Sequence, residues 1–245
     1  MANFTGYRSN TNGLLCQANG DQGDTACRTG VYYTLLAVSG ALNDDLGRLA
    51  GQGFKIDLDK LTVSDGVFCR APDGTWHAFY GNFTRDQHSQ LILAAAAFKD
   101  KKSLWNTVKR FPLRLFFHQN TYDDGPNSKR VFPDIMSPGE LTTILRGVYT
   151  WWLAPIIWPM LMCLDAVLCL DNYFRLKSLW DADNLIAARL MFDLKNTPTP
   201  FTFLNKYLYR KSDYKARILN NYSLENNGVV PLGELYVQIA SEQIG

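Results

Sequence analysis

The chain has 245 residues, of which 47% are hydrophobic and 20% are charged, and its 25 Lys and Arg residues against 23 Asp and Glu residues give a formal net charge of +2. These values are typical of a globular protein and exclude a disordered chain, a collagen-like chain and a disulfide-rich mini-protein. The nearly balanced charge also argues against a dedicated nucleic-acid-binding protein, which carries a basic stripe.

Cysteine usage and the N-terminal sequence bear on the compartment. The five cysteines follow no regular spacing and form no Cys-x-x-Cys pair, so we expect neither a disulfide framework nor a metal site, and no motif indicates a cofactor. The segment MANFTGYRSN lacks the basic region and apolar run of a signal peptide. The sequence therefore predicts a cytosolic or virion-associated protein.

The first predicted helix follows a polar, glycine-rich loop over residues 1–23. Apolar residues recur at helical spacing over residues 25–42, and Asp24 stands where an N-cap residue is favoured. Gly30 lies inside this pattern and lowers its helix propensity, which indicates close packing against another backbone.

A β-hairpin is predicted near residues 67–79, where the turn sequence APDG separates Val67–Arg70 from Thr75–Phe79. A helix is expected to follow at once, because Thr84 and Gln87 have the spacing of a capping box before the apolar run LILAAAAF.

Helical patterns continue to the end of the chain, with residues 119–136 as a long polar loop. Ser137, Pro138 and Glu140 form a strong helix start, and Thr199-Pro200 repeats the cap-then-proline signal. We expect these further helices: 101–110, 113–118, 139–152, 156–176, 182–194, 200–210, 213–220 and 232–243. No composition shift marks a domain boundary, so residues 1–245 are predicted to form a single, all-α domain of packed helical hairpins.

The segment YTWWLAPIIWPMLMCL, residues 149–164, has no charge but is shorter than the roughly 20 apolar residues of a transmembrane helix. Pro155 and Pro159 interrupt it, and Asp165 and Asp171 follow, so we expect residues 149–170 to be buried by other helices and membrane insertion to be disfavoured. One of the two aspartates is expected to be a satisfied core carboxylate.

The first candidate site is the loop-to-helix junction Asp21–Arg28. Its two carboxylates, Asp21 and Asp24, are suited to acid or base chemistry where burial separates their pKa values, and Arg28 is suited to bind an anionic or hydroxylated ligand. The structural alternative is that Asp24 only caps the helix and Arg28 only pairs with an acid.

The second candidate site combines the predicted hairpin with the following helix start. It contains an aromatic pair, an imidazole, a guanidinium, a carboxylate and an amide within twelve residues, namely Trp76, His77, Tyr80, Arg85, Asp86 and Gln87. Sugar rings stack on aromatic faces, and Arg, Asp and Gln bind sugar hydroxyls. The alternative is that Asp86 only stabilises the helix N-terminus and Trp76 only packs in the hairpin.

The order GDQGDTACRTG, then GTWHAFYGNFTRDQ, then an aromatic-rich helical chain resembles the α/α-toroid, or six-hairpin, carbohydrate-active proteins, including phage-encoded ones. The resemblance implies a truncated α/α barrel, since a full ring of twelve helices usually needs a longer chain. It implies Asp24 and Asp86 as acid and base, with Arg28 and Arg85 as ligand contacts.

These observations lead to a glycan-active enzyme as the first hypothesis, with paired carboxylates that hydrolyse an oligosaccharide or polysaccharide. A lyase that acts on acidic sugars fits Arg28, Arg85 and His77. The alternatives are a non-catalytic phage or host-interaction protein and a membrane-associated protein anchored through residues 149–164.

Overall fold

A computed structural model describes most of the chain, and helices dominate it. The described residues are 9, 11–16, 22–39, 44–72, 85–117, 119–123, 129–133, 138–178, 183–225 and 231–245. The elements are α1 (Thr25–Val38), α2 (Asp44–Leu61), β1 (Thr62–Ser64), β2 (Val67–Phe68), α4 (Arg85–Ala97), α5 (Lys101–Phe117), β3 (Gln119–Asp123), β4 (Lys129–Pro133), α6 (Pro138–Val148), the 3₁₀ turn η2 (Trp151–Leu153), α7 (Ala154–Ser178), α8 (Asp183–Lys195), α9 (Pro200–Arg210), α10 (Tyr214–Glu225) and α11 (Pro231–Gln243). The predicted all-α class is confirmed.

Helices α1 and α4 pack side by side and run in the same direction. At their first turns, the Gln87 Nε2 donates to the Gly23 carbonyl over 3.0 Å. Farther along, Gly30 lies so close to α4 that a Cβ built on it would stand 2.4 Å from the carbonyl carbon of Gln90. The predicted close backbone packing at Gly30 is therefore confirmed.

Helices α4, α6 and α8 also run parallel to one another. His88 near the start of α4 contacts Glu140 near the start of α6, and Ala96 near the end of α4 lies against Gly147 near the end of α6. Arg146 of α6 pairs with Asp193 of α8. The N-terminal ends of α1, α4 and α6 therefore point toward one end of the molecule.

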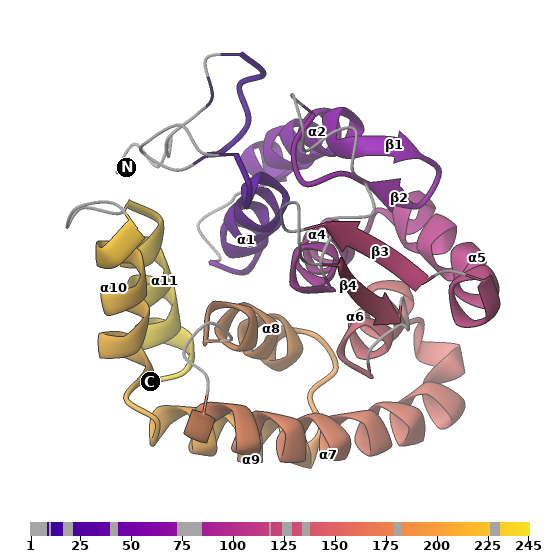
Figure 1. Ribbon diagram of the computed structural model, residues 1–245. Coiled ribbons are helices and arrows are strands. Elements are labelled where there is room, and N and C mark those ends of the chain that lie inside the picture. Colours follow the sequence, from indigo (N-terminus) through magenta and orange to yellow (C-terminus); the bar gives the residue numbers. More distant parts are fainter. Residues whose placement is uncertain are drawn as a thin grey trace.

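Figure 1 shows α1, α4, α6 and α8 on the inside, with α2, α5, α7, α9, α10 and α11 around them. Along the chain from α1 to α9, an inner helix alternates with an outer one. The inner helices are apolar on most of their surface because neighbours enclose them, and residues 91–96 of α4 are all buried.

The first β-hairpin is formed by strands β1 and β2, and β1 was not predicted. Strand β2 begins at Val67 as expected, but it pairs antiparallel with β1, which directly follows α2. The tight turn through Gly66, which adopts a positive φ of 72°, closes this hairpin. The predicted partner Thr75–Phe79 lies outside the described residues, so pairing across APDG stays a prediction.

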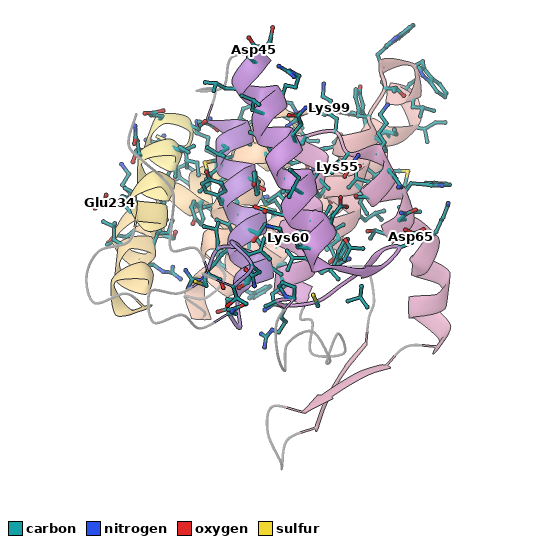
Figure 2. All side chains as sticks on the ribbon, turned by 90° about the horizontal axis from the view of Figure 1, so that it is seen from above. Asp45, Lys55, Lys60, Asp65, Lys99 and Glu234 are labelled. Atoms are coloured by element: carbon teal, nitrogen blue, oxygen red, sulfur yellow. The ribbon has the colours of Figure 1, made fainter. Side chains whose placement is uncertain are left out.

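The polar segment after α5 was predicted as a loop, and that prediction is wrong for much of it. Strands β3 and β4 pair antiparallel in regular register from Gln119 with Pro133 to Asp123 with Lys129. Neither strand alternates polar and apolar residues, since Tyr122 is the one apolar residue of β3 and Val131 and Phe132 are adjacent in β4, so the sequence lacks the usual strand signal here. Figure 2 shows the hairpin extending from the end of the molecule nearer Lys60, away from Asp45.

The helix starts were predictable where proline and a short polar side chain coincide. Thr199 caps α9 through a reciprocal capping box with Thr202, and Pro200 is the first helical residue. Pro138 likewise begins α6. Helix α2 has no such start signal, and it continues without a break from Asp44 to Leu61.

The apolar segment after α6 is exposed, and the predicted burial of residues 149–170 is wrong. A single stripe of α7 packs inward, and it includes Ile157, Leu161 and Asp165. The opposite side faces solvent, where Ile156 and Leu170 are each 63% exposed, and Trp151 of the preceding turn η2 is 83% exposed. Because the segment is apolar on both sides, its composition could not reveal that only one side has neighbours. The segment from Trp151 to Phe174 is also long and apolar enough to cross a membrane.

Replacement of Gly30 by alanine is expected to lower the free energy of unfolding by about 1–3 kcal/mol, because the new methyl group would overlap the backbone of α4. The matched control is Gly51→Ala in α2, where the added Cβ meets the Phe98 ring at an ordinary 3.4 Å and the gain in helix propensity is up to about 1 kcal/mol. Urea denaturation measures both. Equal stability of the two variants would contradict the close α1–α4 contact.

Candidate functional site

The first candidate residues meet where α1 and α4 begin. The Asp24 Oδ1 accepts a hydrogen bond from Gln87 Nε2 at 3.3 Å and lies 3.8 Å from the Arg70 guanidinium. The Asp24 side chain is 44% exposed, whereas Arg70 and Gln87 are largely covered. The arrangement presents one oriented carboxylate to solvent at the shared N-terminal end of the inner helices.

Asp24 does not use its side chain as a helix cap. It stands at the N-cap position of α1, but its carboxylate makes no capping hydrogen bond. The Gln87 amide likewise reaches across to Gly23 and Asp24, while its partner in the predicted capping box, Thr84, lies outside the described residues. Both side chains therefore have contacts beyond local helix capping.

Polar side chains are buried around this junction on both helices. The Arg28 side chain is buried, and its backbone N–H closes the first turn of α1 on the Asp24 carbonyl. In the part of the chain that the structure describes, buried atoms without a hydrogen-bond partner include Thr25 Oγ1, Thr29 Oγ1, Gln87 Oε1 and Gln90 Oε1. Such atoms are costly in a folded protein and are commonly satisfied by water or a ligand.

A second polar cluster joins α4 to α6, and the sequence analysis did not predict it. The His88 Nδ1 lies 2.7 Å from the Glu140 Oε1, which also accepts from the Ser89 hydroxyl at 3.2 Å, and all three side chains are buried. Because a carboxylate only accepts, we assign the proton of this contact to His88 Nδ1. The available signal was the run Gln87–Gln90, four polar residues directly before an apolar run in one helix.

Glu140 lies in the first turn of α6 as predicted, and its side chain contacts α4, while Ser137 lies outside the described residues. The adjacent Gly139 leaves room for Arg189 of α8, whose Nη2 donates to Thr143 Oγ1 at 2.9 Å. Burial lowers the pKa of Arg189, and the nearby carboxylates of Asp193 and Glu140 oppose that effect. This cluster therefore links three inner helices through groups that water does not reach.

The third polar cluster lies around Arg146 and joins α6 to α7 and α8 inside the core. Its guanidinium contacts Asp165 at 2.7 Å and Asp193 at 3.3 Å. Asp165 also accepts hydrogen bonds from the hydroxyls of Thr199 and Thr202 at 2.6 and 3.1 Å. Asp165 is thus the satisfied core carboxylate that was expected, while Asp171 is exposed. Because its Oδ2 accepts hydrogen bonds from three side chains of the core, Asp165 has a structural role.

The structure brings together some of the sequence-predicted residues. Asp24 and Gln87 are in contact, and Arg28 follows Asp24 by one helical turn. The backbone of Arg85 and Asp86 opens α4 next to Gln87. Their side chains, together with Trp76, His77 and Tyr80, lie outside the described part. Among the described residues, no group of three or more His, Cys, Asp or Glu side chains is arranged to hold a metal ion.

Comparison of the chain with protein-family models, with curated proteins and with solved structures finds no match. The function therefore has to be argued from the geometry of these clusters.

Burial of the Asp193 carboxyl makes stability depend on pH. Burial raises the pKa of Asp193 to about 6, even though Arg146 and Arg189 oppose the shift. In the unfolded chain this carboxyl loses its proton near pH 4, whereas the folded protein keeps the proton up to about pH 6. The free energy of unfolding therefore falls as the pH rises from about 4 to about 7. The contribution present at low pH is lost as pH rises through the folded pKa.

We expect the free energy of unfolding of the wild type, relative to Asp193→Asn, to fall by on the order of 3 kcal/mol across that interval. Denaturant titrations of both proteins at a series of pH values measure the difference. If the unfolding free energies of the two proteins differ by the same amount at every pH, a raised pKa at Asp193 is contradicted.

Proposed function

We propose that the chain is a glycan-active enzyme whose substrate binds at the N-terminal ends of α1 and α4. The observation that carries the proposal is the half-exposed Asp24 carboxylate, oriented by Arg70 and Gln87. A carboxylate oriented in this way is suited to act as a base or nucleophile at a sugar carbon. The positive ends of the dipoles of two adjacent helices favour a polar or anionic ligand there.

Asp86 is the second carboxylate of the proposed pair. Its backbone lies one residue before Gln87 in the first turn of α4, and the Gln87 side chain contacts Asp24. In a hydrolase one of the two carboxyl groups protonates the leaving oxygen, and the other activates water or attacks the sugar. Trp76 and Tyr80, from the segment that leads into α4, are proposed to stack on sugar rings.

The helical arrangement also supports this proposal. Parallel inner helices enclosed by outer helices are the arrangement expected of a truncated α/α toroid, the architecture of the carbohydrate-active proteins that the sequence resembles. In such an arrangement the loops before the inner helices share one end of the ring. Asp24 and the start of α4 both lie at that end.

A lyase that acts on acidic sugars is the other catalytic form of the proposal. Arg70 and the proposed contacts Arg28 and Arg85 would favour a uronate over a neutral sugar. The two forms differ in product, since a hydrolase adds water across the bond and a lyase leaves an unsaturated sugar.

Turnover is tested on a panel of neutral and acidic polysaccharides, with reducing ends and unsaturated products measured separately. Asp24→Asn and Asp86→Asn are each expected to lower kcat by about a hundredfold or more, because each removes one acid or base. The thermal unfolding midpoint of Asp24→Asn should change little, since exposed ion pairs contribute only about 0–1 kcal/mol.

Asp45→Asn is the matched control, because Asp45 is an exposed carboxylate on α2 that also lies near an arginine. It should leave turnover unchanged. Full activity in both Asp24→Asn and Asp86→Asn would overturn the assignment of these residues. Binding of a glycan by the wild type with no detectable product would overturn the enzyme and favour a glycan-binding protein.

A further inference from the structure

Helices α7 and α9 and the turn η2 expose an apolar surface that no described element covers. The two helices lie side by side (Figure 1), joined by a hydrogen bond from Asn172 to Asn205 and by the contacts of Asp165 with Thr199 and Thr202. We define the α7–α9 face by its exposed apolar residues, namely Trp151, Trp152, Ile156, Trp158, Met160, Val167, Leu170, Tyr173, Phe174, Phe203, Leu204 and Tyr207.

The composition of the α7–α9 face is unusual for a surface in contact with water only. Single exposed apolar residues are common, but a contiguous group marks a site for a partner or a membrane. Trp151, Trp152 and Trp158 gather at the end where α7 begins. Tryptophan is enriched at the boundary between lipid and water, because its ring is apolar and its N–H is polar.

The inward side of α7 is not available to lipid. Asp165 is buried and bonded to Arg146, Thr199 and Thr202, so removal of α7 from the protein would break these buried hydrogen bonds and leave Arg146 without its 2.7 Å carboxylate partner. The helix therefore stays packed on α6 and α9 while its outer side meets the partner. This favours contact in the plane of a membrane surface over a span across it.

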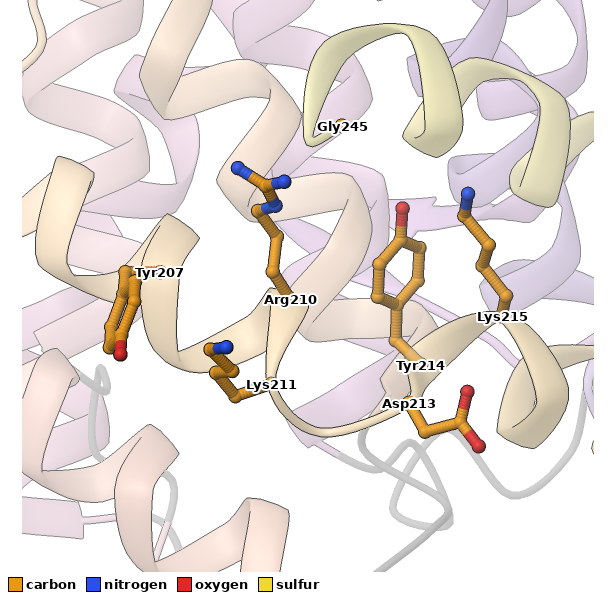
Figure 3. Close-up of a pocket in the computed structure, with 7 residues that line it drawn as sticks. All are labelled: Tyr207, Arg210, Lys211, Asp213, Tyr214, Lys215 and Gly245. Atoms are coloured by element: carbon orange, nitrogen blue, oxygen red, sulfur yellow. The ribbon is translucent and has the colours of Figure 1, made fainter.

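A cationic pocket adjoins the α7–α9 face at the end of α9. The pocket has a volume of about 430 Å³. Figure 3 shows the residues that line it, namely Tyr207, Arg210, Lys211, Asp213, Tyr214, Lys215 and Gly245. Tyr207 belongs to both the apolar face and the pocket, and the Lys211 ammonium stands over its ring at 5.7 Å from the centroid. The apolar and cationic surfaces are thus continuous along one helix.

Positive charge also dominates the chain around this pocket. Between residues 200 and 218 there are five basic side chains and one acidic side chain, in a protein with a net charge of only +2. A basic group beside an exposed apolar, tryptophan-containing helix matches the negative surface of a bilayer that contains anionic phospholipids.

We propose that the α7–α9 face binds the surface of an anionic phospholipid bilayer, with a lipid phosphate in the cationic pocket and the apolar side chains among the acyl chains. This inference does not depend on the proposed glycan activity. A second copy of the chain fits less well, because a symmetric dimer through this face would bring two cationic pockets toward one another.

Flotation of the full chain with vesicles tests the proposal. The protein is expected to float with mixed phosphatidylcholine–phosphatidylglycerol vesicles, to remain unbound with pure phosphatidylcholine vesicles, and to be released as salt is raised. The tryptophan emission should shift to the blue only with the mixed vesicles. Absence of flotation with the mixed vesicles, or equal flotation with both kinds, would overturn the proposal.

Charge reversal tests the cationic pocket. Arg210→Glu combined with Lys211→Glu is expected to weaken binding to the mixed vesicles by about tenfold or more. The matched control, Arg48→Glu combined with Lys55→Glu, reverses two exposed cations of α2 and should leave binding nearly unchanged. An equal loss in both double variants would show general attraction by net charge and would overturn the pocket as the headgroup site.

Polar substitution tests the apolar face. Ile156→Ser combined with Leu170→Ser should abolish flotation, whereas Leu49→Ser combined with Ile56→Ser, at exposed apolar positions of α2, should not. Circular dichroism verifies that each variant keeps its helices. A wild-type dimer in sedimentation, converted to monomer by the Ile156 and Leu170 changes but not by the α2 changes, would overturn the lipid assignment in favour of a second copy.

Discussion

The close approach of α1 to α4 at Gly30 is the constraint on which the rest of the structure depends. Because Gly30 has no side chain, the backbone of α1 lies directly on that of α4 near Gln90, and the two helices run in parallel. Parallel packing places their first turns at the same end, where Gln87 reaches Gly23 and Asp24. The candidate site is thus a direct consequence of a contact made two helical turns away.

The polar groups of the molecule divide into those that are satisfied by the fold and those that face outward. Arg146 pairs with Asp165 on the inner side of α7 and with Asp193 of α8, so these contacts explain why a helix that is apolar on its outer side still has a fixed inner side. Asp24 is different, because it is half exposed although two covered side chains orient it. A side chain that is oriented by its neighbours but still reaches solvent is suited to contact a ligand.

The sequence predicted the helices well because caps and periodicity are local signals. Thr199-Pro200 and Pro138 begin helices as expected, and the glycine at position 30 correctly indicated close packing. Long-range features were less predictable. The partner of β2, the contact of His88 with Glu140 and the exposed side of α7 all depend on which elements become neighbours. An apolar helix has the same sequence pattern whether one side or both sides are covered, so burial of residues 149–170 could not be decided from composition.

The central claim is that a glycan binds where α1 and α4 begin, and hydrogen exchange measured with and without a bound oligosaccharide tests it most directly. The account predicts slower exchange at the first-turn amides of both helices, around Thr25–Arg28 and Gln87, with α7 and α9 unchanged. Slower exchange confined to α7, α9 or α10, or no change at the start of α1 under saturating oligosaccharide, would contradict it.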